Sequence, residues 1–322
     1  MISVAVIIVT YKTAQLTIDC LHSISAERDA NTVQITVTVV DNSTEDFSSI
    51  QQAIELNRWS DWVEVVCPPK NGGFAYGNNF GVKIAYSRRS PDYIHFLNPD
   101  TVVRKGAIRT LVDFLETNPA AGIAGSSFEN LDGTDWPFAF RFPTMVSEIE
   151  GGLGLGLVTK LLHRWVVAKK MGKSPEQTDW VPGASMMVRR STFDVTGGLD
   201  EAYFLYFEET DFCFRAKKHG LQTWYIPDSR VMHIAGQSTK VTERNAENRR
   251  LPSYWFESRR RFFMKSYGVP YAILTDIVAI AAYFLGKVKR LLLRQSEREI
   301  PCFISDLVRY GAFWPKKAVS KR

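Results

Sequence analysis

The chain has 322 residues, of which 45% are hydrophobic, 12% aromatic and 23% charged. This composition is that of an ordinary globular protein and argues against a collagen-like, disordered or disulfide-scaffold class. Four widely separated cysteines form no C-x-x-C pair. We therefore expect neither a structural zinc site nor a disulfide framework, and we expect a reducing, cytoplasmic environment.

The net charge of +6 is unevenly distributed along the chain. Residues 240–322 carry 18 Lys/Arg against 7 Asp/Glu, whereas the first 239 residues carry 22 against 27. An acidic body is thus joined to a basic tail, which suggests an anionic partner such as nucleic acid, a membrane surface or a phosphorylated substrate. The start of the chain has no basic region and no small-residue cleavage site, so we expect no signal peptide.

Strand and helix patterns alternate over the first 125 residues. Short apolar runs predict strands, and apolar residues at helical spacing predict helices. The strands are expected at 4–9, 33–40, 63–66, 93–97 and 121–125, and the helices at 13–26, 74–86 and 106–116. This alternation predicts an α/β fold with a mainly parallel central sheet flanked by helices. Ligands of such sheets bind beyond the carboxyl ends of the strands.

The pattern changes between residues 141 and 177. The stretch GGLGLGL at 151–157 is too glycine-rich for a helix interior, and a basic, aromatic segment follows it. We expect a mobile insertion with one short helix. Regular structure is expected to return as a strand at 180–188 and a helix at 208–219.

The basic tail contains a long apolar segment. Residues 269–286 carry Asp276 as their one charged residue, and four basic residues follow by position 294. Eighteen residues lie at the lower edge for a membrane span, and the charge counts against one. A helix lying in the membrane plane with a basic rim is favoured, with a buried or oligomerising helix and a true span as alternatives.

Polar motifs follow several of the predicted strands. Asn98-Pro99-Asp100 offers a carboxylate that could hold a divalent cation against a diphosphate, although it is also good turn chemistry. Asp41-Asn42-Ser43 could accept the imide N–H of uracil or thymine, or could cap a helix. Asn71–Asn79 is glycine-rich, which lets backbone approach a ligand, but it lacks the GK[ST] of a Walker loop.

Three carboxylates, Glu208, Glu209 and Asp211, lie together at a predicted helix start. The helix dipole favours acidic residues there, but mutual repulsion should raise the pKa of at least one toward that of a useful base. His233 is either a metal ligand or diphosphate contact, or a structural histidine.

Seven motifs in this order resemble glycosyltransferase family 2, in particular its bacterial rhamnosyltransferase-like branch: VIIVTYK, VVDNST, NGGFAYGNN, FLNPDT, WVPGASMMVRR, YFLYFEETDFCFR and MHIAGQST. The resemblance covers about residues 4–268 and implies the GT-A fold. Residues 1–125 would form the nucleotide-sugar half and 126–268 the acceptor half, which contains the 141–177 insertion. Residues 269–322 would form a helical, membrane-associating or oligomerising tail.

The resemblance also implies roles for single residues. Asp100 stands where many relatives end an Asp-x-Asp motif, so it would bind Mg²⁺ or Mn²⁺ with His233; Asn98 supplies one carboxylate fewer. Glu209 matches the catalytic base, usually an Asp, and Glu208 or Asp211 could share its work. Gly183 and Ala184 would lie on the acceptor side. The implied donor-binding residues are Thr10, Tyr11, Asp41, Asn71, Gly73, Asn78, Asn98, Asp100 and Ser238.

The implied activity is inverting transfer of a sugar from a nucleoside diphosphate sugar to an acceptor hydroxyl. The branch favours dTDP-L-rhamnose as donor and a lipid-linked or polysaccharide glycan as acceptor. A polyprenyl-diphosphate acceptor would explain the tail and would place the chain at the inner face of the plasma membrane. We expect no nucleic-acid partner, and a homo-oligomer remains an alternative.

Three other functions stay open at this point. One is a family-2 transferase that uses a UDP-sugar, and another is a non-catalytic sugar-nucleotide-binding protein with a degenerate site. The third is a sugar nucleotidyltransferase, but the sequence lacks the glycine-rich, Lys- or Arg-bearing N-terminal loop that this class needs.

Overall fold

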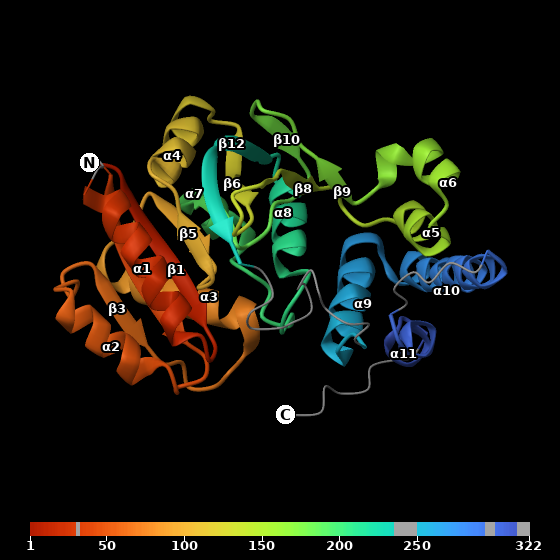
Figure 1. Ribbon diagram of the computed structural model, residues 1–322, viewed down its shortest axis with the longest axis horizontal. Coiled ribbons are helices and arrows are strands. Elements are labelled where there is room, and N and C mark those ends of the chain that lie inside the picture. Colours follow the sequence, from red (N-terminus) through yellow and green to blue (C-terminus); the bar gives the residue numbers. More distant parts are fainter. Residues whose placement is uncertain (30–32, 235–249, 294–299, 314–322) are drawn as a thin grey trace. The chain divides into compact units, whose positions relative to one another are not determined.

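The structure, a computed structural model, describes residues 1–29, 33–234, 250–293 and 300–313 and divides into two compact units (Figure 1). Unit 1 comprises Met1–Phe140, Lys170–Phe204 and Glu208–Glu243. Unit 2 comprises Arg141–Lys169, Leu205–Phe207 and Arg244–Arg322. The segment 141–169 therefore clusters with the C-terminal helices, whereas the sequence analysis placed it in the acceptor half.

Unit 1 is built on a ten-stranded mixed sheet of order β10-β12-β6-β11-β4-β1-β2-β3, with β5 beside β12 and β7 beside β6. The neighbours β4, β1, β2 and β3 are all parallel, and β11 is antiparallel to both of its neighbours. This confirms the predicted α/β class. The strands are β1 (Ser3–Thr10), β2 (Gln34–Asp41), β3 (Val63–Val66), β4 (Tyr93–Leu97), β5 (Thr101–Val103), β6 (Ala121–Glu129), β7 (Asp135–Trp136), β10 (Glu176–Thr178), β11 (Ser185–Arg189) and β12 (Gln222–His233).

The helices of unit 1 are α1 (Ala14–Asp29), α2 (Phe47–Leu56), α3 (Gly73–Arg88), α4 (Ala107–Thr117), α7 (Arg190–Thr196) and α8 (Glu208–Lys218). Two short strands, β8 (Phe138–Phe140) and β9 (Ala168–Lys170), stand at the two ends of the 141–169 segment in the sequence. The predicted elements of the first 125 residues are all present, but α2 and β5 among them, and β12 further along the chain, were not predicted. The strand expected at 180–188 begins only at Ser185, because Pro182 has no N–H for a strand ladder.

Alternate residues of β1 face opposite sides of the sheet. Val6 and Ile8 belong to a buried cluster with residues of α1, α2 and α4, including Leu21, Ile54 and Leu111. Successive residues of β1 thus pack against helices on opposite faces of the sheet. Because both faces of the strand are buried, its apolar run is unbroken.

The opposite side of β1 is covered by α3, and glycines set the distance. A Cβ added at Gly77 would lie 2.9 Å from the side chain of Val9, and one added at Gly81 would lie 2.6 Å from that of Ile7. Gly77, in the predicted donor loop, and Gly81, just after it, therefore let a helix lie close against the sheet. Their role is packing, and ligand approach is not needed to explain them.

Unit 2 is helical. It contains α5 (Met145–Leu153), α6 (Gly156–Leu161), the short 3₁₀ helix η1 (His163–Trp165), α9 (Ser253–Tyr267), α10 (Val269–Leu292) and α11 (Phe303–Tyr310). Helix α5 begins with a capping box in which Ser147 N–H donates to the Thr144 hydroxyl at 3.2 Å. The expectation that 151–157 avoids a helix interior was wrong for Gly151 and Gly152, which lie within α5.

Packing against α10 explains the second of these glycines. A Cβ at Gly286 of α10 would lie 2.2 Å from the Gly152 carbonyl oxygen, and a Cβ at Gly152 would lie 2.8 Å from that of Ala282. The low helix propensity of glycine is accepted here because two helix backbones approach each other directly.

We predict that Gly286→Ala separates α5 from α10 and lowers the free energy of unfolding by about 1–3 kcal/mol, the usual effect of overpacking. The matched control is Gly151→Ala in α5, where an added Cβ meets no atom within 4 Å. That change should be neutral or should stabilise by about 0.5–1 kcal/mol, since alanine favours a helix. Urea-induced unfolding of both variants measures the difference, and equal effects would contradict the close contact.

Candidate functional site

The turn Asn98-Pro99-Asp100 lies between β4 and β5, next to the end of β12. Strand β5 pairs with β12 so that Thr101 is opposite His233. As a result His233 Nε2 lies 3.4 Å from Asp100 Oδ1 and 3.4 Å from Asn98 Nδ2. The structure therefore brings together the two predicted metal ligands, which are 133 residues apart in the sequence.

The residues of this turn fit a divalent cation. A carboxylate oxygen and an imidazole nitrogen are both accepted by Mn²⁺, and Mg²⁺ commonly uses one or two carboxylates with substrate phosphates. No group of three or more His, Cys, Asp or Glu side chains suited to a metal occurs among the described residues. The remaining ligands would thus have to come from the diphosphate and water. Asn98 lines the turn without adding negative charge.

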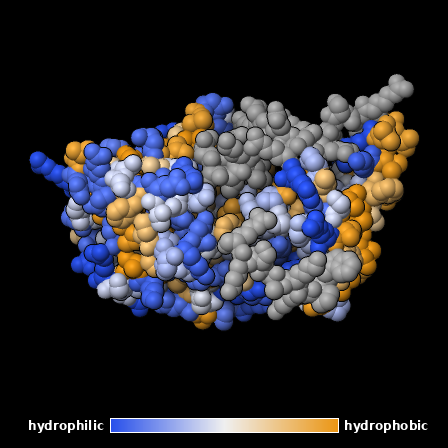
Figure 2. All heavy atoms as spheres, turned by 90° about the horizontal axis from the view of Figure 1, so that it is seen from below, coloured by the Kyte–Doolittle hydropathy of each residue, from blue (hydrophilic) through white to orange (hydrophobic). Residues whose placement is uncertain are grey.

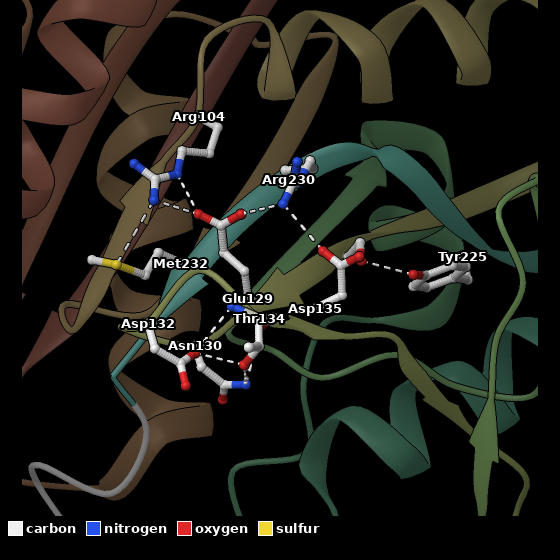
Figure 3. A network of polar contacts seen from close by, with 10 residues as sticks. Arg104, Glu129, Asn130, Asp132, Thr134, Asp135, Tyr225, Arg230 and Met232 are labelled. Carbon is white, nitrogen blue, oxygen red and sulfur yellow. Dashed lines mark hydrogen bonds and ion pairs between the residues drawn. The ribbon is translucent and has the colours of Figure 1, made fainter.

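A charged network braces the strand that carries His233 (Figure 3). Glu129 of β6 is 4% exposed and binds Arg104, which follows β5, and Arg230 of β12, the latter at 2.7 Å. Arg230 also reaches Asp135 of β7 at 3.1 Å. The buried Glu129 carboxylate thus links β6 to β12 and to the residue after β5. These ion pairs stabilise the β5–β12 register that places His233 beside Asp100.

Glu209 lies in the first turn of α8, and its carboxylate is bound by the backbone N–H groups of Gly183 and of Glu209 itself. Its Oε2 is buried and has no hydrogen-bond partner among the described residues. Burial raises the pKa of Glu209 above its ordinary value, and the two N–H groups only partly oppose this. A carboxylate with a raised pKa and one free oxygen has the properties of a general base.

The two neighbouring carboxylates are placed differently. Asp211 is 1% exposed, forms an ion pair with Arg215 at 2.7 Å and accepts a hydrogen bond from Tyr203. Arg215 also donates to the Gly198 carbonyl at 2.7 Å. Asp211 thus fastens α8 to the preceding loop, while Glu208 is 2% exposed at the helix start.

The predicted acceptor-side residues connect Glu209 to the Asn98–Asp100 turn. Asn98 N–H donates to the Ala184 carbonyl at 3.1 Å, while Gly183 N–H donates to Glu209. A Cβ added at Gly183 would lie 3.0 Å from the ring of Phe74, in the predicted donor loop. One stretch of backbone therefore contacts three of the predicted functional segments.

Within the donor loop, Gly73 has φ +87°, and a Cβ there would lie 1.9 Å from the Phe204 carbonyl oxygen. Asn71 Oδ1 accepts from Gly73 N–H at 3.1 Å and holds this turn. Asn78 is 1% exposed and donates to the Phe74 carbonyl at 2.9 Å, while its Oδ1 has no partner among the described residues. Asn71 thus shapes the loop, and Asn78 retains an unused acceptor.

The three residues predicted to contact the nucleoside differ in how exposed their side chains are. Thr10 and Asp41 are fully buried, whereas Tyr11 is 43% exposed. Asp41 accepts hydrogen bonds from the N–H groups of Ser43 at 2.8 Å and Asp46 at 3.0 Å. Asp41 therefore organises the loop after β2, which is the capping-type alternative. Ser238 lies outside the described residues.

Asp46 is a residue that the sequence analysis missed. It is 6% exposed and accepts from the Thr10 hydroxyl at 2.9 Å and from the Thr13 N–H at 2.8 Å. It thereby joins the loops after β1 and β2 at the strand ends. An acidic residue five positions after Asp41, just before a helix, was the available signal.

Solved glycosyltransferases share this fold. The structure of GalNAc-T7 with UDP, GalNAc and Mn²⁺ aligns with a TM-score of 0.57 at 14% identity, covering 96% of this chain and 57% of that one. The mannosyltransferase PcManGT of Pyrobaculum calidifontis, with GDP-Man and Mn²⁺, aligns with a TM-score of 0.53 at 14% identity, covering 95% and 78%. The fold is therefore of the GT-A type.

The chain belongs to the family described as Glycosyltransferase like family 2, whose model matches residues 3–250. It is 32% identical over 152 residues to the N-acetylglucosaminyl-diphospho-decaprenol L-rhamnosyltransferase of Mycobacterium tuberculosis (strain ATCC 25618 / H37Rv), covering 46% of this chain and 48% of that protein. It is 28% identical over 166 residues to the rhamnosyltransferase WbbL of Escherichia coli (strain K12), covering 51% and 61%. The matches thus span about half to three fifths of these relatives.

The raised pKa of Glu209 predicts a pH-dependent effect on stability. The folded state binds this proton more tightly than the unfolded chain, so folding loses stability as pH rises from about 4.5 through the raised pKa. Glu209→Gln stays neutral and should therefore melt at a higher temperature than the parent at pH 7–8. This advantage should vanish below pH 4.

Thermal melts across this pH range measure the effect. Glu55→Gln, at an exposed position of α2, is the matched control and should leave the melting temperature unchanged at every pH. A lower melting temperature for Glu209→Gln at pH 8 would contradict the buried, poorly satisfied carboxylate.

Proposed function

We propose that the chain is a metal-dependent inverting transferase that moves L-rhamnose from dTDP-L-rhamnose to a hydroxyl of a glycan carried on a polyprenyl diphosphate. The family and the names of the relatives support this donor and acceptor class. The observation that carries the proposal is the free, buried oxygen of Glu209, joined through Gly183 and Ala184 to the Asn98–Asp100 turn.

In the proposed reaction Glu209 removes the proton of the acceptor hydroxyl. The hydroxyl oxygen forms a bond to the anomeric carbon while the bond from that carbon to the diphosphate oxygen breaks on the opposite face. The configuration inverts through an oxocarbenium-like state, and the diphosphate leaves with the electron pair. Mg²⁺ or Mn²⁺, held by Asp100 and His233, would supply charge stabilisation to the diphosphate.

We predict that Glu209→Gln lowers kcat by about 10²–10⁴-fold, because the amide cannot accept the proton, while donor binding is retained. Release of dTDP measures turnover, and a thermal-shift panel of dTDP-L-rhamnose and UDP-sugars measures donor binding. Glu55→Gln is the control with unchanged turnover. Asp211→Asn should mainly lower stability, since it weakens the pair with Arg215.

Each outcome of this panel points to one cause. Normal turnover by Glu209→Gln would refute the base assignment but leave the transferase intact. Turnover with a UDP-sugar alone would reassign the donor. Donor binding without turnover in the parent chain, with lipid-linked acceptor present, would favour a non-catalytic binding protein.

We further predict that Asp100→Asn and His233→Ala each raise the Mn²⁺ concentration at the midpoint of the dTDP-induced thermal shift by at least about tenfold. Each change removes one of the two proposed protein ligands. The measurement is the thermal shift produced by dTDP at increasing Mn²⁺, with EDTA as the metal-free reference. Asp113→Asn, at an exposed position of α4, is the control. An unchanged Mn²⁺ midpoint in both site variants would refute the proposed metal site at this turn.

A further inference from the structure

We propose that two segments of unit 2, residues 155–165 (α6 and η1) and 274–293 (the outer face of α10), form one surface that docks on an anionic lipid bilayer. This set of residues is called the docking surface below. The proposal does not depend on the identity of the sugar donor, because it concerns only unit 2.

Helix α10 has two distinct faces. The face packed within unit 2 consists of small or polar residues at helical spacing: Ala272, Thr275, Asp276, Ala279, Ala282 and Gly286. The outward face consists of large apolar residues: Leu274, Ile277, Phe284, Leu285, Val288, Leu291 and Leu292, of which Leu291 is 78% exposed. At 3.6 residues per turn the outward set occupies about a third of the helix circumference. The fully buried residues of α10 are thus small or polar, Tyr271, Ile280 and Tyr283 pack within unit 2 beside them, and the large residues of the outward face are directed to solvent.

The length and hydropathy of α10 alone would also permit a membrane span. The buried charge in its first third, Asp276, decides against one. Asp276 is 1% exposed and forms an ion pair with Arg259 of α9, itself 1% exposed, which also binds Glu148 of α5 at 3.1 Å. Asp276 further accepts the Ala312 N–H. Spanning would require α10 to leave these partners and carry an unpaired carboxylate into hydrocarbon, whereas in-plane docking leaves them intact.

The segment 155–165 adds a second apolar element. Leu157 is 81% exposed, Leu161 76% and Trp165 42%. This segment follows α5, which packs on α10 at the contact between Gly152 and Gly286, and Lys289 Nζ of α10 donates to the Gly154 carbonyl at 2.6 Å. The two elements are therefore held together within unit 2. Figure 2 shows hydrophobic atoms gathered at the right of the view, on the side where α10 is drawn in Figure 1.

The charges of the docking surface select the partner. Neither 155–165 nor 277–293 contains an Asp or Glu, while 155–165 and the outer half of α10 contain four basic residues: Lys160, Arg164, Lys287 and Lys289. Lys287 and Lys289 flank the apolar face of α10 on opposite sides. A second copy of this surface would bring like charges together, whereas anionic headgroups complement the rim as the apolar face enters the acyl boundary.

The test is co-sedimentation of the full chain with vesicles of phosphatidylcholine, alone or with about 30% phosphatidylglycerol. We expect binding to the anionic vesicles that weakens at least about tenfold between low and high salt, and little binding to the neutral ones. Ile277→Glu/Leu285→Glu in α10 and Leu157→Glu/Leu161→Glu in 155–165 should each reduce binding at least tenfold. Leu56→Glu at the end of α2, which is 76% exposed like Leu161, is the matched control and should bind normally.

The possible results separate the parts of the proposal. Full binding by Leu157→Glu/Leu161→Glu would overturn the two-element surface, and equal binding to neutral vesicles would overturn the anionic specificity. A dimer in solution that both double variants dissociate, without vesicle binding by the parent, would overturn the membrane in favour of self-association. Circular dichroism melts confirm that the exposed substitutions leave the fold intact.

Discussion

The hydrogen bond from the Gly183 N–H to the Glu209 carboxylate ties the site together. A buried carboxylate with an unpartnered oxygen is unfavourable by itself, and the backbone N–H offsets part of that cost. The same backbone supplies the Ala184 carbonyl to Asn98 N–H, so Glu209 and the Asn98–Asp100 turn are both positioned by the consecutive residues Gly183 and Ala184. Side-chain freedom is small on this path, because each contact involves main chain. This main-chain path, together with the Glu129 network behind β12, holds the proposed catalytic groups in a fixed arrangement.

Backbone strain gathers at the ends of the elements that carry these groups. Tyr206 and Phe207 have φ of 69° and 68° immediately before Glu208, and Lys12 and Thr44 have φ of 58° and 62° after β1 and β2. Left-handed conformations of non-glycine residues cost about 1–3 kcal/mol and persist where the surroundings impose them. Strained backbone thus coincides with the strand and helix ends at which ligands of an α/β sheet bind.

The elements and the strand ends could be predicted from the sequence because apolar periodicity is local. The burial of side chains at those strand ends could not be predicted. Thr10 and Asp41 do lie at strand ends as expected, but they are fully buried and hold loops together. The Asp211–Arg215 pair could have been found, since the two lie four residues apart on a predicted helix. The contact between Gly152 and Gly286 could not be predicted from local sequence patterns, because the two residues are 134 positions apart.

The buried charge of Asp276 also explains how an apolar helix can have a defined orientation. Its pairing with Arg259 fixes the rotation of α10 about its axis, so that the large apolar residues face outward together. The basic excess of the tail then includes one arginine that serves this internal pairing, while lysines flank the outward face. A net charge alone cannot distinguish these roles. If the acceptor is carried on a polyprenyl lipid, docking confines enzyme and acceptor to the same two-dimensional layer and raises their effective concentration. The ion pair inside unit 2 would then contribute to activity without touching any substrate.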